Sequence, residues 1–322
     1  MGNLKVGVIG TGNHGSRYAK HIGDDIDGLE LSAVCRRSGT VFEQAEKWGC
    51  RGYQDYHELI SDKNVEALVV VVPPMLNLDI VKAATTVGKP LLVEKPLAGG
   101  VEDGEEIVAL CRKTKTPLTV GQTLRYNQVV QRLKGELPKL GRLYSFNANQ
   151  RLEPSSLDWH EDPVQAGAGV SFHTAVHVID AISFISGLKV KRVLALARSR
   201  HNHKLEDLLT VMVEMEGGVL GTLDCSKVAE ARSGSFEFVC EEGQLHGEQV
   251  HNRISLIHGM EREVLDPGPV QPTIIPILEQ WRDYLAGTAN NPVSGEEGLA
   301  ALKFCDACLR SSASDSWVNI IK

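Results

Sequence analysis

The feature that most constrains what this chain can fold into is a glycine-rich turn near its N-terminus. Val6, Val8 and Ile9 are β-branched and uncharged, as in a short buried strand. The turn that follows has the spacing G-x-G-x-x-G and leads into a predicted helix over Asn13–Ile22. In such a unit the first glycine permits a tight turn, the second lets a pyrophosphate approach the backbone, and the third lets the helix lie close to the strand.

This strand–turn–helix context favours dinucleotide binding over an ordinary glycine-rich turn. The first N–H groups of a helix have no partners within the helix, so they are available to the pyrophosphate. The candidate cofactor-binding residues of the turn are Gly10, Thr11, Gly12, Asn13, His14 and Gly15.

The end of the second predicted strand, Leu29–Cys35, bears on which dinucleotide is bound. An acidic residue is expected there when the ribose hydroxyls are recognised. This chain has Arg36, Arg37 and Ser38 instead, and a guanidinium is suited to binding a 2′-phosphate. We therefore expect NADP(H) to be preferred over NAD(H). The alternative is that both arginines are solvated loop charges.

Two further runs predict neighbouring strands of a parallel sheet. Val65–Val72 is apolar without alternation, as in a strand buried on both faces, and its end forms a rim of Val72, Pro73 and Pro74. Pro90–Val93 is the next such strand.

The second of these strands delivers Glu94 and Lys95 at its carboxyl end, where open parallel sheets bind their ligands. Helices are predicted between the strands, at Thr40–Trp48, Tyr56–Ile60, Asp79–Val87 and Glu102–Lys113, and Leu118–Val120 is the last strand of the first domain.

The segment Gly88–Ala98, with Glu94-Lys95-Pro96 at its centre, resembles the signature of the Gfo/Idh/MocA oxidoreductases, which include glucose–fructose oxidoreductase and inositol dehydrogenase. The resemblance covers nearly the whole chain and continues in Val6–Gly15, Val69–Pro74, Val120–Gly121, Arg125–Tyr126, Gly167–Asp180 and Pro292–Gly298. It implies a nicotinamide cofactor and an enzyme acting on CH–OH groups.

The second half of the chain predicts a largely antiparallel sheet, because its strands are joined by tight turns such as Glu216–Gly218. The predicted strands are Gly141–Ala148, Val190–Ala197, Leu208–Met215, Val219–Asp224 and Ser235–Cys240, and the predicted helices are Gly167–Gly187, Ile274–Leu285 and Glu296–Ser311. We expect an α/β protein with a Rossmann domain over residues 1–120 and an α+β domain with a large, open, mostly antiparallel sheet over residues 121–322. The last helix, about 296–312, is a candidate to pack back on the first domain.

His173, His177 and Asp180 are spaced by four and three residues, which places them on one helical face. The corresponding family segment resembles G-G-G-x-x-x-D-x-G-x-H-x-x-D. This chain matches its histidine and its last aspartate, but His173 replaces the first aspartate. That aspartate would favour the charged form of Lys95, whereas a neutral histidine does so less and a charged one opposes it. His173 therefore either adds a second proton relay or weakens turnover.

Oxidation of a secondary alcohol requires removal of the hydroxyl proton as hydride leaves the carbon. Imidazole, with an ordinary pKa of about 6.5, suits that step near neutral pH. We assign His177 as the general acid/base, and Lys95 as the group that stabilises charge on the same oxygen. The resemblance implies the same two roles. A metal site at His173 and His177 is the weaker alternative, because no third ligand is evident.

The resemblance adds residues around these groups. Asn77 stands where the family often has a histidine, and Gln122 is a candidate to face the nicotinamide. Arg125 and Tyr126 match a family pair near the active site; the alternative is a salt-bridged arginine beside a packed tyrosine. The substrate-binding candidates, besides Lys95, His173 and His177, are Arg125, Tyr126, Trp159 and His160. The last two stand where the family often has Trp-Arg, so His160 takes the place of the arginine.

Composition limits the partners and the compartment. The formal net charge of -7 gives no basic surface for nucleic acid or membrane, and no apolar run approaches the roughly 20 residues of a membrane span. Seven scattered cysteines, an odd number, suit reduced thiols in a cytoplasm. The open face of the second sheet is expected to form a homodimer or homotetramer.

These observations lead to an NADP(H)-dependent oxidoreductase that acts on a sugar, a polyol or a similar small hydroxyl or carbonyl compound. The altered catalytic group at His173 keeps a second reading open, a cofactor-binding sensor with impaired catalysis. The breadth of the family keeps a third, reduction of a linear tetrapyrrole or a cyclic diol.

Overall fold

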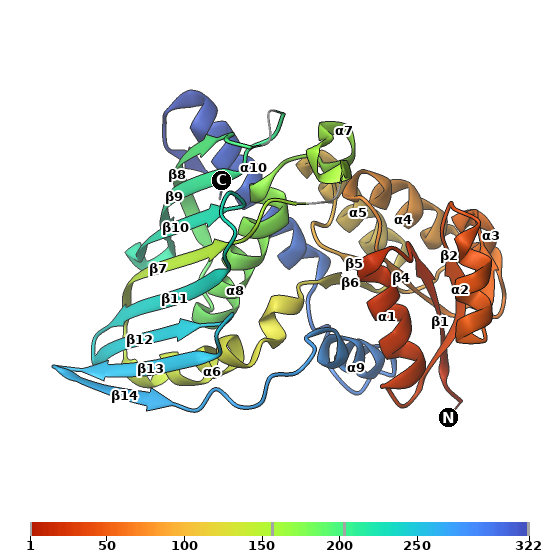
Figure 1. The fold of residues 1–322 in the computed structure, drawn as a ribbon, viewed down its shortest axis with the longest axis horizontal. Helices are drawn as coiled ribbons and strands as arrows, with labels where there is room; N and C mark the ends of the chain where they lie inside the picture. Colours follow the sequence, from red (N-terminus) through yellow and green to blue (C-terminus); the bar gives the residue numbers. More distant parts are fainter. Residues whose placement is uncertain (1, 156–157, 202–203, 321–322) are drawn as a thin grey trace. The chain divides into compact units, whose positions relative to one another are not determined.

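A computed structural model describes residues 2–155, 158–201 and 204–320 (Figure 1). The chain divides into two compact units, of which the first is Met1–Thr123 with Pro272–Leu299 and the second is Leu124–Gln271 with Ala300–Lys322. The sequence predicts that all of residues 121–322 belong to the second domain, whereas Pro272–Leu299 belongs to the first unit. The reason is tertiary, because Ser294 forms a β-bridge with Thr119.

The first unit contains a parallel sheet with the strand order β3-β2-β1-β4-β5-β6 among the described residues. Its strands are β1 (Leu4–Ile9), β2 (Leu29–Cys35), β3 (Arg51–Tyr53), β4 (Ala67–Val70), β5 (Leu91–Glu94) and β6 (Leu118–Gly121). The order reverses between β1 and β4, and in such sheets the ligand site lies beyond the carboxyl ends of the strands at this point. All residues of β4 are fully buried, as predicted for a strand covered on both faces.

Helices follow these strands as the apolar spacing predicts. They are α1 (Asn13–Asp24), α2 (Thr40–Trp48), α3 (Tyr56–Ser61), α4 (Asn77–Thr86), α5 (Val101–Thr114) and the returning helix α9 (Ile274–Leu285). Helix α9 packs against α1, and Arg282 on α9 donates a hydrogen bond to the carbonyl of Asp27 (2.6 Å). The helix α10 (Gly295–Ser314) starts in this unit against β6, where a Cβ at Gly298 would lie 2.6 Å from Val120, and continues in the second unit.

The second unit contains a nine-stranded sheet in its described part, with the order β14-β13-β12-β11-β7-β10-β9-β8-β15. The strands are β7 (Leu143–Arg151), β8 (Val190–Arg198), β9 (Leu208–Met215), β10 (Leu220–Ser226), β11 (Ser233–Cys240), β12 (Gly243–Glu248), β13 (Arg253–His258), β14 (Glu261–Leu265) and β15 (Val318–Asn319). All neighbouring pairs except β7 with β10 are antiparallel, so the predicted fold class is confirmed.

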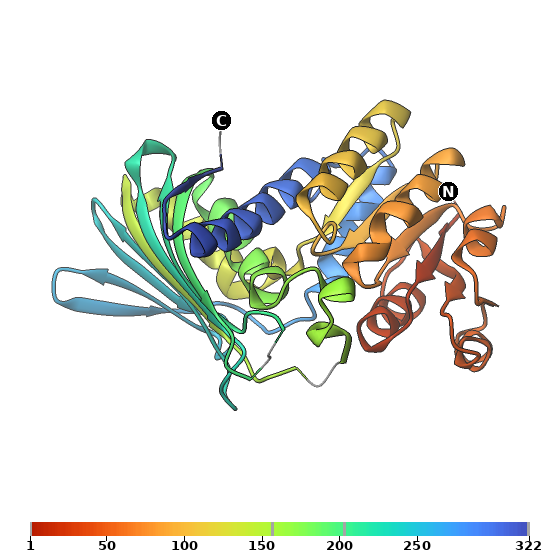
Figure 2. The same ribbon diagram turned by 90° about the horizontal axis from the view of Figure 1, so that it is seen from above.

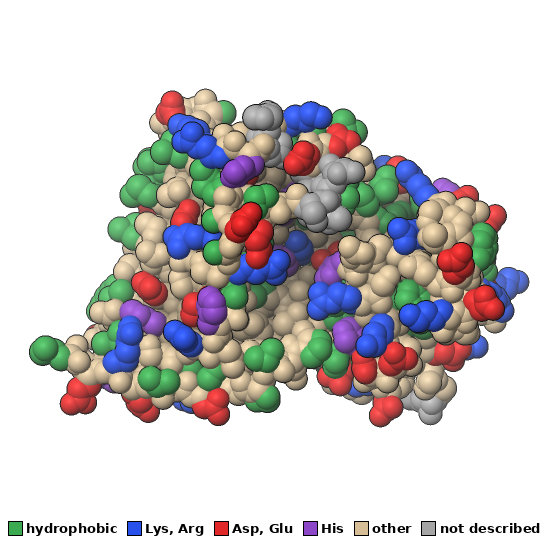
Figure 3. Space-filling model, in the orientation of Figure 1, with side chains coloured by type: hydrophobic (Ala, Val, Ile, Leu, Met, Phe, Trp, Pro, Cys, Tyr) green, Lys and Arg blue, Asp and Glu red, His purple; other side chains and the backbone are tan. Residues whose placement is uncertain are grey.

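One face of this sheet is covered and the other is open. Helices α6 (Gln128–Glu136) and α8 (Val176–Ser186) and the C-terminal part of α10 lie on one face, and no described element covers the other (Figure 2). Leu196, Met212 and Leu220 are 52%, 52% and 58% exposed on neighbouring strands β8 to β10, and hydrophobic side chains gather along this edge in Figure 3. The short helix α7 (Pro163–Ala166) precedes the glycine-rich segment before α8.

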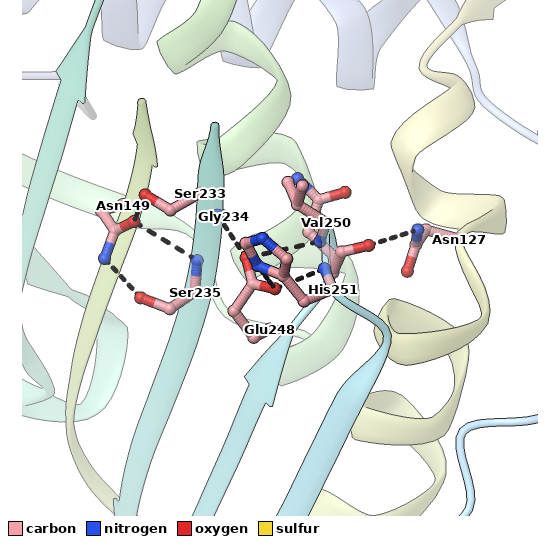
Figure 4. Close-up of polar contacts among 9 residues, drawn as sticks. Asn127, Asn149, Ser233, Gly234, Ser235, Glu248, Val250 and His251 are labelled. Carbon is pink, nitrogen blue, oxygen red and sulfur yellow. Dashed lines mark hydrogen bonds and ion pairs between the residues drawn. The ribbon is translucent and has the colours of Figure 1, made fainter. Parts of the chain in front are cut away.

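The turn between β12 and β13 is fixed by one carboxylate (Figure 4). Oε1 of Glu248 accepts hydrogen bonds from the N–H groups of Gly234 (2.6 Å) and Val250 (3.4 Å), and Oε2 lies 2.7 Å from Nδ1 of His251. These contacts tie the turn to β11. They stabilise the outer strands β12 to β14, which were not among the strands predicted from the sequence.

Pro163–Ser186 is 24 residues long and apolar enough, by length and composition, to cross a membrane. This differs from the expectation that no apolar run reaches such a length. The difference arises because the mean hydropathy over the stretch stays high although a few polar residues interrupt it. Of its most apolar window, 78% is buried inside the protein. A core helix passes this test equally well, and the buried residues of α8 place it in the core of the second unit.

Candidate functional site

The three glycines of the turn after β1 occupy three different environments. Gly10 has φ +96° and a Cβ there would lie 2.1 Å from the carbonyl oxygen of Val71, so the tight turn requires glycine. A Cβ at Gly15 would lie 1.9 Å from the carbonyl oxygen of Gly10, so helix and strand approach closely. A Cβ at Gly12 would meet nothing within 4 Å, which leaves this side of the turn open.

The start of α1 is suited to an anion. Gly12 is its N-cap, no side chain of the described residues caps it, and its first turn carries no acidic residue. Asn13 and His14 are exposed in this first turn. The N–H groups at the helix start and the positive end of the helix dipole are therefore available to a phosphate.

The basic end of β2 lies beside the same turn. Nη1 of Arg36 donates to the carbonyl oxygen of Thr11 (3.3 Å), and Nε2 of Gln44 donates to that same oxygen (3.2 Å). The side chains of Arg37 and Ser38 are exposed. The structure thus brings Arg36 to the glycine-rich turn and leaves Arg37 at the surface.

Glu94, at the end of β5, is the centre of a buried polar cluster. Its Oε1 lies 2.9 Å from Nε2 of His14 and accepts a hydrogen bond from the Tyr18 hydroxyl (2.6 Å), while Oε2 accepts from the N–H of Lys95 (3.0 Å). Burial alone raises the pKa of Glu94, but His14, Lys95 and Tyr18 outweigh it, so the pKa is lowered. Burial and the nearby carboxylate raise the pKa of Tyr18 well above its usual value.

The loop that follows Glu94 is held by Asn77, the first residue of α4. Asn77 is 1% exposed, and its amide nitrogen donates to the carbonyl oxygens of Pro96 (3.3 Å) and Leu97 (3.1 Å). Lys95 is half-buried at the start of this loop, and the Lys95–Pro96 peptide bond is cis. Val72 and Pro73 are half-buried after β4 and Pro74 is buried, so the predicted rim is present.

Gln122 follows β6 and is 1% exposed. Its backbone N–H donates to the carbonyl of Val120 (2.8 Å), but neither atom of its side-chain amide has a hydrogen-bond partner among the described residues. A buried amide without a partner costs free energy, so this position is suited to a polar ligand.

In the second unit, the two candidate histidines lie on consecutive helical turns of different kinds. His173 lies in a π-helical turn, Ser171–Ala175, and His177 is the second residue of α8. The sequence predicts a helix here without such a turn, whereas π turns are rare and are frequently found at functional sites. The rings of His173 and Trp159 meet edge to face with centroids 5.7 Å apart. The structure therefore brings His173 and Trp159 together. The side chain of His160 lies outside the described residues.

Arg125 and Asp180 form a buried, bidentate salt bridge. Nε and Nη2 of Arg125 donate to the two carboxylate oxygens of Asp180, each over 2.7 Å, and both side chains are at most 5% exposed. Tyr126 is also buried, at 7%. This arrangement matches the alternative of a salt-bridged arginine beside a packed tyrosine. Within the second unit, the salt bridge joins the segment before α6 to α8.

The sequence patterns did not indicate four residues that make polar contacts with the predicted segments, namely Tyr18, Gln44, Ser171 and Glu206. Tyr18 lies four residues after His14 on α1, so helical spacing could have found it. Glu206 accepts hydrogen bonds from Gly169 and Ser171 across 35 or more residues, and no local pattern signals such a contact.

Both units match models of known protein families. Residues 4–122 match the family described as "Oxidoreductase family, NAD-binding Rossmann fold", and residues 134–246 match the "GFO/IDH/MocA C-terminal domain". The chain is similar to myo-inositol 2-dehydrogenase of Thermotoga maritima, with 25% identity over 70% of this chain and 69% of the relative. It is also similar to D-apiose dehydrogenase of Paraburkholderia graminis, with 25% identity over 98% and 90% of the two chains.

A solved structure of levoglucosan dehydrogenase with NADH and levoglucosan has the same fold, with a TM-score of 0.88, 20% identity and coverage of 99% and 100%. The two family matches together span most of the chain, and they agree with the parallel sheet of the first unit and the mostly antiparallel sheet of the second. The chain belongs to the Gfo/Idh/MocA family of NAD(P)-dependent oxidoreductases.

Proposed function

We propose that this protein transfers a hydride between a nicotinamide dinucleotide and a hydroxyl or carbonyl carbon of a sugar, a polyol or a similar small molecule. The observation that carries the proposal is the Glu94 cluster, which joins the phosphate-binding turn at His14 to the loop of Lys95 within the first unit. The relatives named for myo-inositol, D-apiose and levoglucosan support the substrate class.

The first unit fits a dinucleotide on two independent observations. The open side of Gly12 at an uncapped helix start suits a pyrophosphate, and the buried amide of Gln122 suits a polar ring substituent. The bound nicotinamide would supply the hydride chemistry. The residues that would hold the cofactor are Gly10, Thr11, Gly12, Asn13, His14, Gly15, Arg36, Arg37, Ser38, Val72, Pro73, Pro74, Asn77, Glu94, Lys95 and Gln122.

The preferred cofactor in this proposal is NADP(H), with NAD(H) as the alternative. Support comes from the end of β2, where Arg37 is exposed and Arg36 lies against the glycine-rich turn. We expect Arg37→Ala to weaken NADPH binding and to leave NADH binding unchanged, because only NADPH carries the 2′-phosphate. Titration calorimetry with both cofactors decides; a wild-type preference for NADH contradicts the assignment.

The protein's own groups handle the proton. In oxidation, a nitrogen of the His177 imidazole takes the hydroxyl proton while the carbon loses hydride and the C=O bond forms. The Lys95 ammonium donates a hydrogen bond to that oxygen and stabilises its developing charge. His173, on the π turn before α8, is the third catalytic candidate and a second site for the proton.

Substrate contacts in this proposal come from Lys95, His173, His177, Trp159 and His160. Arg125 and Tyr126 were predicted to contact the substrate too; in this proposal they hold α8 instead, which the bidentate contact of Arg125 with Asp180 and the burial of Tyr126 support.

The open face of the nine-stranded sheet supports assembly into a homodimer or homotetramer. Exposed apolar side chains on adjacent strands lose water on such contact, and Leu196, Met212 and Leu220 offer them. Seven free cysteines support a cytoplasmic protein. Light scattering of wild type and of Met212→Glu tests the assembly: we expect a smaller particle for the variant.

The decisive experiment is a hydride-transfer assay over a panel of sugars, polyols and cyclitols with both cofactors, read by absorbance of the reduced nicotinamide. We expect turnover that Lys95→Ala and His177→Ala each reduce by about a hundredfold or more. Full turnover in either variant contradicts the assigned roles. Tight cofactor binding without turnover on the whole panel favours a sensor, the alternative that His173 in place of the family aspartate supports.

A further inference from the structure

Glu206 lies against the glycine-rich segment that leads into the π turn. Its Oε1 accepts hydrogen bonds from the N–H groups of Gly169 (2.9 Å) and Ser171 (3.1 Å) and from the Ser171 hydroxyl (2.5 Å). An ordinary helix N-cap side chain satisfies one orphan N–H group. Here one carboxylate oxygen receives three donors and comes from a segment 35 residues further along the chain.

The backbone of Glu206 is fitted to the same segment. Its carbonyl oxygen accepts the N–H of Val170 (2.8 Å), and a Cβ at position 169 would lie 1.9 Å from that oxygen. Position 169 must therefore be glycine for Glu206 to lie where it does. The next residue, Asp207, accepts the N–H groups of Arg200 (2.8 Å) and His201 (2.6 Å), which fixes the segment from its other side.

Ser171 passes this restraint to the π turn. It is fully buried, and both of its donor groups go to Glu206. Its carbonyl oxygen accepts the N–H of Val176, the i→i+5 bond that widens the turn, and also the thiol of Cys305 (3.1 Å). The residue that begins the π turn is thus held through its N–H, its hydroxyl and its carbonyl.

His173 is two residues further along in the widened turn, and its N–H donates to the carbonyl of Gly169 (3.1 Å). His173 and Glu206 line one small cavity of about 40 Å³. If the contacts of Glu206 are removed, the turn has space beside it in which to relax. A charged acceptor at the start of a helical segment also gains from the helix dipole and from charge-assisted hydrogen bonds.

We infer that Glu206 is a positioning residue, which sets the place of the His173 imidazole through Gly169 and Ser171. The inference rests on the proposed function, because that function places His173 among the reacting groups. Glu206 does not enter the reaction itself.

Two substitutions separate the hydrogen bonds from the bulk of the side chain. Glu206→Ala removes the acceptor, and we expect kcat to fall about ten- to a hundredfold, since small displacements of a reacting group have effects of that size. The dissociation constant of the cofactor stays unchanged, because its candidate residues belong to the first unit. Glu206→Gln keeps an acceptor oxygen, so we expect it to restore most of kcat.

Glu297 offers a matched control. Its Oε2 accepts hydrogen bonds from the N–H (2.8 Å) and the hydroxyl (2.9 Å) of Ser294 at the start of α10. Glu206 makes the same pair of contacts with Ser171, but Glu297 is far in sequence from His173 and His177. We expect Glu297→Ala to lower the free energy of unfolding and to leave kcat unchanged. A kcat in Glu206→Ala equal to that of wild type, or an equal fall in Glu297→Ala, overturns the inference.

A readout that needs no substrate completes the test. In Glu206→Ala, amide exchange at Gly169 and Ser171 should speed up about tenfold or more, and the NMR resonances of the His173 ring should shift. Neither change is expected in Glu297→Ala. Unchanged exchange and unchanged His173 resonances in Glu206→Ala overturn the inference. If wild type turns over no substrate, the proposed function fails, while exchange and NMR still decide the role of Glu206.

Discussion

Nε2 of His14 lies 2.9 Å from Oε1 of Glu94, a contact across 80 residues of sequence that joins the glycine-rich turn after β1 to the loop after β5. The other oxygen of Glu94 accepts the N–H of Lys95. Both segments were predicted to bind cofactor, each from its own motif. Because one buried carboxylate connects the two segments, we expect a substitution in either segment to affect the position of the other.

Replacing His14 by alanine removes a donor from this buried carboxylate. We expect the free energy of unfolding to fall by about 1.5–3 kcal/mol, the contribution of one hydrogen bond to a charged group, because Oε1 keeps only the Tyr18 hydroxyl as a donor among the described residues. Cofactor affinity should fall as well, because the turn and the Lys95 loop lose their link. Urea denaturation and titration calorimetry measure the two effects. His21→Ala is the control, since His21 contacts Asp25 (2.6 Å) on the same helix; equal losses of affinity contradict the prediction.

The lowered pKa of Glu94 predicts how stability depends on pH. Burial raises this pKa, but His14, Lys95 and Tyr18 outweigh it, so the folded value lies below the unfolded value of about 4.3. The ionised group therefore stabilises the fold above the unfolded pKa, and this contribution is lost as pH falls through the folded pKa. Glu94→Gln should show a flatter decline of unfolding free energy below about pH 5. Equal slopes in both proteins would rule this out.

Asp180→Asn should be strongly destabilising, because it leaves the Arg125 guanidinium buried without its anionic partner. We expect a loss of about 3–5 kcal/mol in urea denaturation. Asp306→Asn on α10 breaks an exposed pair with Arg310 (2.7 Å) and should cost less than about 1 kcal/mol. A similar cost in both variants would show that burial does not determine the strength of the Arg125 contact.

The thiols should react slowly in the folded protein at pH 8. Burial raises the pKa of Cys35 to about 12 and those of Cys50, Cys111 and Cys240 to about 11, and burial also raises the pKa of the fully buried Cys225, Cys305 and Cys308. A pKa of about 11 leaves roughly one thiolate in a thousand at this pH. An aromatic disulfide reagent should label all seven cysteines quickly only after unfolding. A fast thiol in the native protein would be contrary to this expectation.

Much of the first unit could be predicted from the sequence. The run Leu29–Cys35 and the helix Thr40–Trp48 have the predicted bounds, and the glycine spacing places the turn between β1 and α1. These elements depend on local patterns, namely unbroken apolar runs, helical spacing and glycine at a positive φ. The strands β12 to β14 were not predicted, because charged and small residues interrupt the alternation in Gly243–Glu248 and Glu261–Leu265.

The candidate site divides in the same way. Motifs and spacing alone predicted which residues bear chemistry: the glycine-rich turn, Lys95 and the two histidines. Only the tertiary structure decided which side chains hold them, with Glu94 joining His14 to Lys95, Asp180 taken by Arg125, and Glu206 fixing the π turn before His177. The physical reason is that periodicity and glycine conformation act within a few residues, whereas a buried carboxylate takes its donors from whichever segments the folded core brings to it.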